Sequence, residues 1–391
     1  MKISELQNLL AERGFEGWLF CDFRRSNPIA YQALGLRTQI VTRRWYYFVP
    51  ARGEARGLVS ALEQHALDEL PGEKRVYRTW QEREAGLAAL LDGATHIAVE
   101  YSPRNAIPYI SRVDAGTIEL LRSLGKEPVS SADLVQYAVA RWSDAQLVSH
   151  LAASERIMRA KDHAFAYIGE RLRAGATLTD YEVQQLMWAD FQADGIEADD
   201  PPIVATNANA SDPHYLPTAE RQTPIRAGDV VLIDFWGKLK QPDAVYADHT
   251  WMAYADSSVP PRQAEVFAAV AAARDAAIAL VRRRTTAGEP LHGYEVDDAA
   301  RAVIEDAGFG EYFVHRTGHS IGEEVHGDGA NMDNFESHDE RLVLPRTCFS
   351  IEPGIYLPEF GVRSEVDVYV HEDGQITVTG GPPQRTMTPL L

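Results

Sequence analysis

The sequence predicts an α/β domain over residues 1–140, followed by an α+β domain over residues 141–391 that contains an internal duplication with pseudo-two-fold symmetry. In the first domain, short apolar runs typical of strands alternate with helical patterns, which favours a largely buried sheet. From about Ser143 the pattern changes to long helices. The duplication is directly visible, because AGATLTDYEV at 174–183 recurs as AGEPLHGYEV at 287–296 with six of ten positions identical.

Length and composition are those of an ordinary globular protein with room for two domains. The chain has 391 residues, of which 45% are hydrophobic and 24% are charged. The formal net charge is −19, from 38 basic and 57 acidic side chains. Because phosphate binding needs a basic surface, we expect no nucleic-acid partner and no anionic membrane partner.

Several features favour a soluble, cytoplasmic protein. The amino-terminal segment is amphipathic and lacks the uninterrupted apolar run of a signal peptide. The most apolar helical stretch, residues 267–281, carries Arg274 and Asp275 in its middle, so it is not expected to span a bilayer. Both cysteines, Cys21 and Cys348, lie in apolar runs and are expected to be buried free thiols, as in a reducing compartment.

In the first domain the patterns predict strands at 17–20, 46–49 and 97–99, and helices at 62–70 and 83–91. No glycine-rich phosphate loop follows any of these strands, so no nucleotide site is expected. We expect this domain to have a supporting or oligomerisation role.

The second domain repeats one order of elements: a long helix, a short helix and a hairpin. The long helices are predicted at 144–172, after Ser143 as N-cap, and at 262–284. The short helices end near Gly195 and Gly308, which keep the 113-residue offset of the duplication. Two such halves facing each other would place both hairpins in one central antiparallel sheet, with the helices outside.

Each predicted hairpin carries two carboxylates. In the first, at 231–251, the apolar run before Asp234 turns back to Asp248, 14 positions later. In the second, Glu352 follows an apolar strand and Glu365 lies on the return strand, 13 positions later. A carboxylate at the end of an apolar strand is costly unless a positive charge meets it. For the first hairpin alone, two unrelated strand-end acids would be an equally good interpretation, but the second hairpin favours one site built twice.

Histidines are expected to join the four acids. His315, His319 and His326 lie among glycines just before the second hairpin, and His214 precedes the first. Four carboxylates with imidazole nitrogen suit two divalent ions, manganese first, with cobalt, zinc or iron(II) able to compete. Two such ions activate water and polarise a carbonyl. The sequence has neither a G-x-S-x-G nucleophile elbow nor an HEXXH zinc motif.

The chain resembles the Xaa-Pro dipeptidases (prolidases) and Xaa-Pro aminopeptidases, which are pita-bread metallopeptidases. The matching segments occur in family order between residues 201 and 370: PPIVATNANASDPHY, VLIDFWG with YADHT, HRTGHSIGEEVH, FSIEPGIY and GVRSEVDVYV. Each segment alone is weak evidence, but five in order are highly specific. Residues 1–140 resemble the family's creatinase-like amino-terminal domain, and residues 141–391 its pita-bread catalytic domain.

The resemblance implies hydrolysis of the peptide bond preceding proline, most simply in Xaa-Pro dipeptides, by a hydroxide that two metal ions activate, in a homodimeric enzyme. The implied metal ligands are Asp234, Asp248, His319, Glu352 and Glu365. Among these, Asp248 and Glu365 would bridge the ions and Glu352 would also be the general base. His326 and His214 would hydrogen-bond the substrate and the developing oxyanion. Arg363 would steady a bridging carboxylate or meet the substrate's carboxyl end, and His315 has a supporting role at least as readily as a direct one.

The sequence departs from the family pattern in three places. The loop between Asp234 and Asp248 is longer than usual, and HTW replaces the common I-T-R after Asp248. A tyrosine common before the P-I-V segment is absent, since the segment reads Ala198-Asp199-Asp200. Three alternative functions remain: an Xaa-Pro aminopeptidase acting on longer peptides, a creatinase-like C–N hydrolase that needs no metal, and a non-catalytic binding module.

Overall fold

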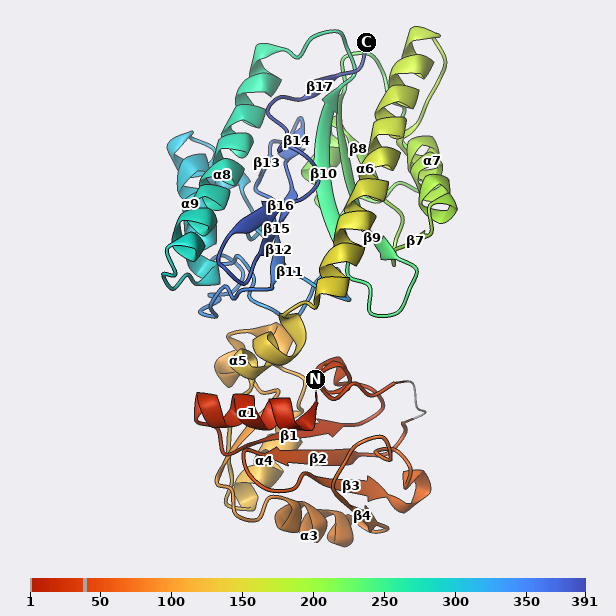
Figure 1. The fold of residues 1–391 in the computed structure, drawn as a ribbon. Helices are drawn as coiled ribbons and strands as arrows, with labels where there is room; N and C mark the ends of the chain where they lie inside the picture. Colours follow the sequence, from red (N-terminus) through yellow and green to blue (C-terminus); the bar gives the residue numbers. More distant parts are fainter. Residues whose placement is uncertain (1, 38–40) are drawn as a thin grey trace. The chain divides into compact units, whose positions relative to one another are not determined.

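The computed structural model describes residues 2–37 and 41–391, which form two compact units, Met1–Ala140 and Arg141–Leu391 (Figure 1). Both cysteines are buried free thiols. Within the described residues, no helix combines the length and the apolarity needed to cross a membrane.

The first unit contains a six-stranded sheet with the order β4-β3-β2-β1-β5-β6. The strands are β1 (Gly17–Asp22), β2 (Trp45–Pro50), β3 (Arg56–Ser60), β4 (Glu73–Tyr77), β5 (His96–Val99) and β6 (Glu127–Ser130). The helices are α1 (Ile3–Arg13), α2 (Pro28–Leu34), α3 (Trp80–Leu90), α4 (Ala115–Ser123) and α5 (Ala132–Val135).

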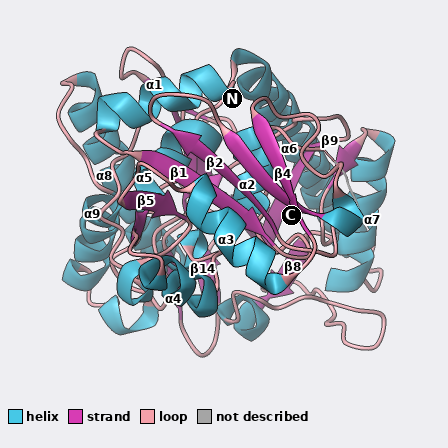
Figure 2. Ribbon diagram, turned by 90° about the horizontal axis from the view of Figure 1, so that it is seen from below, coloured by secondary structure: helices cyan, strands magenta, loops and turns pink. Residues whose placement is uncertain are grey.

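Alternate side chains of β1 enter two different cores, as the period of two along a strand requires. Trp18 and Phe20 pack with α1 and α2, whereas Leu19 and Cys21 pack with α3 and α4. Helices therefore cover both faces of the sheet (Figure 2). The helix predicted at 62–70 is wrong: the chain makes one 3-10 turn, Ala61–Glu63, followed by further turns. Only Leu67 of that segment is fully buried, so a helix there would have almost no packing to stabilise it.

The second unit has helices on both sides of its strands (Figure 1). The helices are α6 (Asp144–Arg173), α7 (Asp180–Ala193), α8 (Pro261–Thr286) and α9 (Gly293–Asp306). The strands are β7 (Ile196–Glu197), β8 (Ile203–Thr206), β9 (Val230–Leu239), β10 (Ala247–Tyr254), β11 (Ser320–Ile321), β12 (Cys348–Ile351), β13 (Gly354–Tyr356), β14 (Gly361–Arg363), β15 (Val366–Val370), β16 (Ile376–Val378) and β17 (Thr388–Pro389).

The repeated Tyr-Glu-Val segment has the same structural role in each half. Glu182 lies in the first turn of α7 and Glu295 in the first turn of α9, each as the acidic member of a capping box. The valines that follow them are buried in two different cores. Gly195 and Gly308 follow the two helices with φ values of 68° and 82°, a left-handed conformation that glycine adopts without strain.

The two hairpins differ more than the sequence predicts. β9 and β10 form one long antiparallel ladder, but the second hairpin splits into a β12–β15 ladder and a separate β13–β14 pair. The hairpins do not merge into one continuous sheet: within the described residues, the main-chain pairing between the β9–β10 sheet and the β12–β15 sheet is a single bridge, between Thr250 and Glu365. The break leaves Glu352 and Glu365 between ladders, where their side chains can face the first hairpin.

Candidate metal centre

The β9–β10 ladder brings Asp234 and Asp248 to one face of the sheet. Asp234 pairs with Thr250 and Asp248 pairs with Trp236, so the two acids are two residue pairs apart. Since side chains alternate along a strand, both acids point to the face on which β9 and β10 pack against α8 and α9. The second hairpin approaches that face.

Three side chains from separate parts of the chain form a close group of potential metal ligands. Asp248, His319 and Glu365 are all buried and each offers one atom within 4.8 Å of the others. Asp248 Oδ1 has no hydrogen-bond partner in the structure. Glu365 accepts a hydrogen bond from the Thr250 hydroxyl at 2.8 Å, which fixes the orientation of its carboxylate.

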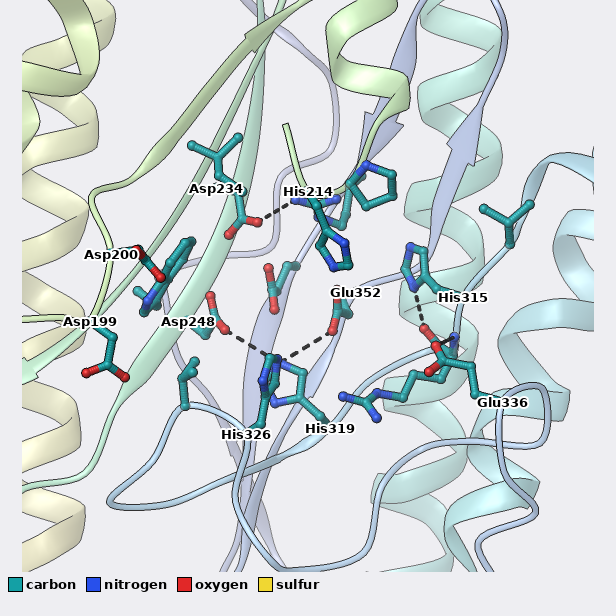
Figure 3. Close-up of a pocket in the computed structure, with 18 residues that line it drawn as sticks. Asp199, Asp200, His214, Asp234, Asp248, His315, His319, His326, Glu336 and Glu352 are labelled. Atoms are coloured by element: carbon teal, nitrogen blue, oxygen red, sulfur yellow. Dashed lines mark hydrogen bonds and ion pairs between the residues drawn. The ribbon is translucent and has the colours of Figure 1, made fainter. Parts of the chain in front are cut away.

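His319 presents a nitrogen lone pair to the acids. Its Nδ1 lies 3.1 Å from the carbonyl oxygen of Ser320, which can only accept, so Nδ1 carries the ring proton. Nε2 then has no proton and lies 3.5 Å from both Asp248 Oδ2 and Glu352 Oε1 (Figure 3). A lone pair facing two carboxylates is unfavourable unless a cation lies between them.

Asp234 and Glu352 complete the ring of acids but are slightly more exposed, with side chains 14% and 16% accessible. Burial raises the pKa of all four carboxyl groups, and for Asp248 and Glu365 it does so strongly. The neighbouring carboxylates raise the pKa values of Asp248 and Glu365 further. The protein alone therefore disfavours the ionised form of this site.

Arg363 links the two hairpins through hydrogen bonds. Its Nη2 donates to Asp234 at 2.5 Å, its Nε to Thr250 Oγ1 at 3.0 Å, and its Nη1 to Tyr356 Oη at 3.0 Å. Thr250 in turn donates to Glu365. Of the two roles expected for Arg363, the contacts favour support of the carboxylates.

Tyr356 is a site residue that the sequence analysis missed. His315 Nδ1 donates to the carbonyl oxygen of Arg316 at 2.6 Å, so its Nε2 accepts from the Tyr356 hydroxyl, also at 2.6 Å. Burial, with the charge of Arg363, lowers the pKa of His315 to about 3, and burial raises the pKa of Tyr356 to about 12. Both groups are therefore neutral near pH 7. The signal was available, because Tyr356 ends the FSIEPGIY segment that contains Glu352.

A cavity of about 690 Å³ opens onto the acids, within the range of roughly 300–1,000 Å³ typical of small-ligand sites. His214 and His326 line it and are exposed. The His326 ring lies 4.4 Å from that of His319 and nearly perpendicular to it. In Figure 3, His214 and His315 lie on one side of the acids, and Asp199 and Asp200 lie on another.

Every predicted site residue thus lines the same cavity. These residues are Asp234, Asp248, His214, His319, His326, Glu352, Arg363 and Glu365. Four carboxylates, one aligned imidazole lone pair and an orphaned carboxylate oxygen fit divalent metal ions that accept oxygen and nitrogen ligands.

Comparison with known proteins agrees with this chemistry. Residues 152–372, more than half of the chain, match the model of metallopeptidase family M24. The chain is similar to a probable dipeptidase, PepE, of Mycobacterium tuberculosis, with 27% identity over 91% of this chain and 89% of the relative. It is also similar to an Xaa-Pro dipeptidase of Lactobacillus delbrueckii subsp. lactis, with 34% identity over 54% of each chain.

Two solved structures share the fold over nearly their whole length. The dipeptidase PepE from Mycobacterium ulcerans has a TM-score of 0.74 and 23% identity, and the alignment covers 99% of this chain and 96% of that chain. A dipeptidase from Pyrococcus horikoshii OT3 has a TM-score of 0.66 and 26% identity, with 99% of both chains covered.

The fold and the family match define a metal-dependent peptidase with an α/β amino-terminal domain and a pita-bread domain, as the sequence predicts. The chain belongs to metallopeptidase family M24.

Proposed function

We propose that this chain is a dinuclear metallopeptidase that hydrolyses the peptide bond preceding proline, with Xaa-Pro dipeptides as its substrates. One observation carries the proposal: four carboxylates and the His319 lone pair converge on one cavity, where Arg363 donates a hydrogen bond to Asp234. Burial of so many acids is costly unless cations neutralise them. The relative named Xaa-Pro dipeptidase supports the choice of substrate.

In this proposal the metal ligands are Asp234, Asp248, His319, Glu352 and Glu365, with Asp248 and Glu365 shared between two ions. When bound, such ions supply an activated water and a Lewis acid for the substrate carbonyl. Manganese is the expected metal, with cobalt, zinc and iron(II) as competitors.

The chain's own residues then bind, orient and transfer protons. Glu352 is suited to take a proton from the attacking water, because its carboxylate lies at the cavity wall. His326 and His214 present ring nitrogens to the cavity, where they would hydrogen-bond the substrate and the developing oxyanion. Arg363 keeps Asp234 in place during the reaction.

Proline explains why a dedicated enzyme is needed. The bond before proline has no N–H on its nitrogen side, and the proline ring fixes φ, so a site that binds extended strands through main-chain hydrogen bonds accepts it poorly. A cavity that recognises side chains and carboxyl groups around a metal pair does not depend on that N–H.

Substrate panels test the proposal. With manganese present, we expect hydrolysis of Ala-Pro and Leu-Pro, at least tenfold slower cleavage of Ala-Ala, and little cleavage of Ala-Pro-Ala. Glu352→Gln serves as the inactive control. Preference for Ala-Pro-Ala would instead indicate an aminopeptidase, full activity after removal of metal would indicate a creatinase-like hydrolase, and no cleavage of any substrate would leave a binding module.

We also propose that residues 141–391 form the catalytic domain, that residues 1–140 are a creatinase-like supporting domain, and that the enzyme is a cytoplasmic homodimer. Sedimentation of the full chain over a range of concentrations tests the dimer, which has about twice the 43.4 kDa mass of one chain.

A further inference from the structure

A second buried polar cluster contacts the main chain of Asp248 from the side away from the cavity. It consists of Asp367 on β15, His150 on α6 and His249 on β10, and none of the three has any exposed surface. Asp367 Oδ2 accepts a hydrogen bond from the main-chain N–H of Asp248 at 2.9 Å. His249 lies where the sequence departs from the pattern it resembles, since HTW follows Asp248 in place of I-T-R.

The two histidines are held in fixed orientations on either side of Asp367. His150 Nδ1 lies 2.7 Å from the carbonyl oxygen of Tyr246, so it carries the ring proton, and Nε2 accepts from Thr379 Oγ1 at 2.9 Å. With both nitrogens engaged by the protein, His150 is not available as a metal ligand. His150 Nε2 lies 3.8 Å from Asp367 Oδ2.

The His249 ring lies beside the same carboxylate. Ser154 Oγ accepts from the Gly380 N–H at 3.1 Å, and its own proton is free for His249 Nε2 at 2.8 Å. His249 Nδ1 lies 3.9 Å from Asp367 Oδ2, which is too far for a hydrogen bond, and it has no other hydrogen-bond partner. The series from Gly380 to Ser154 to His249 therefore holds the His249 ring beside Asp367.

Asp367 is costly to the protein without metal. Its second oxygen has no hydrogen-bond partner, and the neighbouring Asp248 Oδ1 also has none. The described contacts of Asp367 include no arginine or lysine. A buried carboxylate with these neighbours is costly when it is ionised, and positive charge in the adjacent site would offset that cost.

We propose that Asp367, which accepts the main-chain N–H of Asp248 and lies beside His249, is a positioning residue that fixes the metal ligand Asp248 and increases the site's affinity for divalent cations. The inference rests on the proposed function, because it assigns Asp248 as a ligand. Groups behind the direct ligands typically change metal affinity by roughly 10–100-fold when they are removed.

The role predicts effects of opposite sign in the metal-free and metal-bound protein. Asp367→Asn keeps an oxygen that can accept the Asp248 N–H but removes the uncompensated charge. The metal-free variant should therefore melt at the same temperature as the wild type or higher, while its affinity for Mn²⁺ falls about tenfold. Asp367→Ala, which also removes the acceptor, should bind Mn²⁺ more weakly still.

Titration calorimetry with Mn²⁺ alone, together with thermal unfolding of the metal-free protein, measures both effects without using peptidase activity. Asp180→Asn is the matched control, since Asp180 is equally buried but accepts from Tyr215 and Thr223 instead. It should lower the melting temperature and leave Mn²⁺ affinity unchanged. His249→Leu should also lower the affinity for Mn²⁺. This variant tests the inference if the Asp367 variants do not fold.

Mn²⁺ affinity within twofold of wild type in folded Asp367→Asn, or in His249→Leu if only that variant folds, would overturn the inference. An equal loss of affinity in Asp180→Asn would also overturn it. A wild-type protein that binds no Mn²⁺ would instead overturn the proposed function.

Discussion

At the scale of single residues, some lone pairs in the site have no proton donor among the described residues. Asp248 Oδ1 has no partner, and His319 Nε2 faces two carboxylate oxygens at 3.5 Å. These atoms cost free energy in the metal-free protein and become favourable when a cation joins them. The residues that hold metal should therefore contribute little to the stability of the metal-free fold.

Asp248→Ala and Glu365→Ala test that separation. Each should reduce bound metal to background and abolish turnover, because each removes a shared ligand. Each should leave the melting temperature of the metal-free protein unchanged or higher, since a buried acid with a raised pKa is lost. Elemental analysis and thermal unfolding measure the two effects, and a fully active Glu365→Ala enzyme would contradict the assignment.

His326→Ala separates binding of metal from chemistry. The ring lies beside His319 and lines the cavity, but it is not one of the proposed ligands. We expect near-normal metal content and a loss of about 10²–10⁴-fold in kcat, the usual contribution of a positioned proton donor. His338→Ala, at an exposed histidine that does not line the cavity, is the control and should keep full activity. Metal loss in His326→Ala would show that His326 is a ligand instead.

Sequence reasoning reached the acids but not their supports. The four acids could be predicted because each follows or precedes an apolar run within one hairpin, which is local information. The hydrogen bonds from Arg363 to Asp234, and from the Asp248 N–H to Asp367, join residues that are 129 and 119 positions apart, which no local pattern encodes.

At the scale of elements, helix α9 holds the segment that carries His315 and His319. The buried Asp297 on α9 accepts hydrogen bonds from the Thr317 N–H at 3.0 Å and the Asn334 N–H at 2.9 Å. Arg301, one turn further along α9, donates to the carbonyl oxygen of His315 at 2.9 Å. Helix α9, the short helix of the second half, thus fixes the main chain around the histidines.

Asp297→Ala should destabilise the protein by about 3 kcal/mol, because it leaves buried N–H groups without acceptors. Turnover should fall with it, as the loop that carries His319 loses its anchor. Asp298→Ala is the control: this neighbour is exposed, and its carboxylate accepts only from the Asn334 side chain among the described hydrogen bonds. Urea unfolding compares the two, and equal stability of both variants would contradict the anchoring role.

Helices were predicted correctly where the hydrophobic pattern was long. Predictions failed where contacts between distant residues determine the secondary structure. The helices α7 and α9 follow from the repeated segment and its capping residues, and α6 begins after the predicted N-cap Ser143. The helix expected at 62–70 lacks buried contacts, and the break in the second hairpin at Glu352 depends on the bridge between Glu365 and Thr250. Neither fact can be obtained from residues close in sequence.

At the scale of the whole molecule, the acids of the site link stability to pH and to metal. Their pKa values in the folded metal-free protein are raised, so each contributes stability that is present below its unfolded value near 4 and lost as the pH rises through the folded value. Metal binding displaces these protons and reverses the effect.

We therefore expect the site acids to make the metal-free protein lose stability as the pH rises above their unfolded value near 4, and the gain on adding Mn²⁺ to grow as the pH rises. Differential scanning calorimetry of wild type and Glu365→Gln isolates the contribution, because the variant should show a smaller decrease with pH. A steeper decrease in the variant than in the wild type would contradict the expected sign of the effect.

The most direct test of a two-ion centre is the number of Mn²⁺ ions that the metal-free chain binds in titration calorimetry. We expect two per wild-type chain at neutral pH, with proton release, and none at comparable affinity in Asp248→Ala. A wild-type chain that binds no Mn²⁺, or an Asp248→Ala chain that still binds two ions as tightly, would contradict a two-ion centre built on these acids.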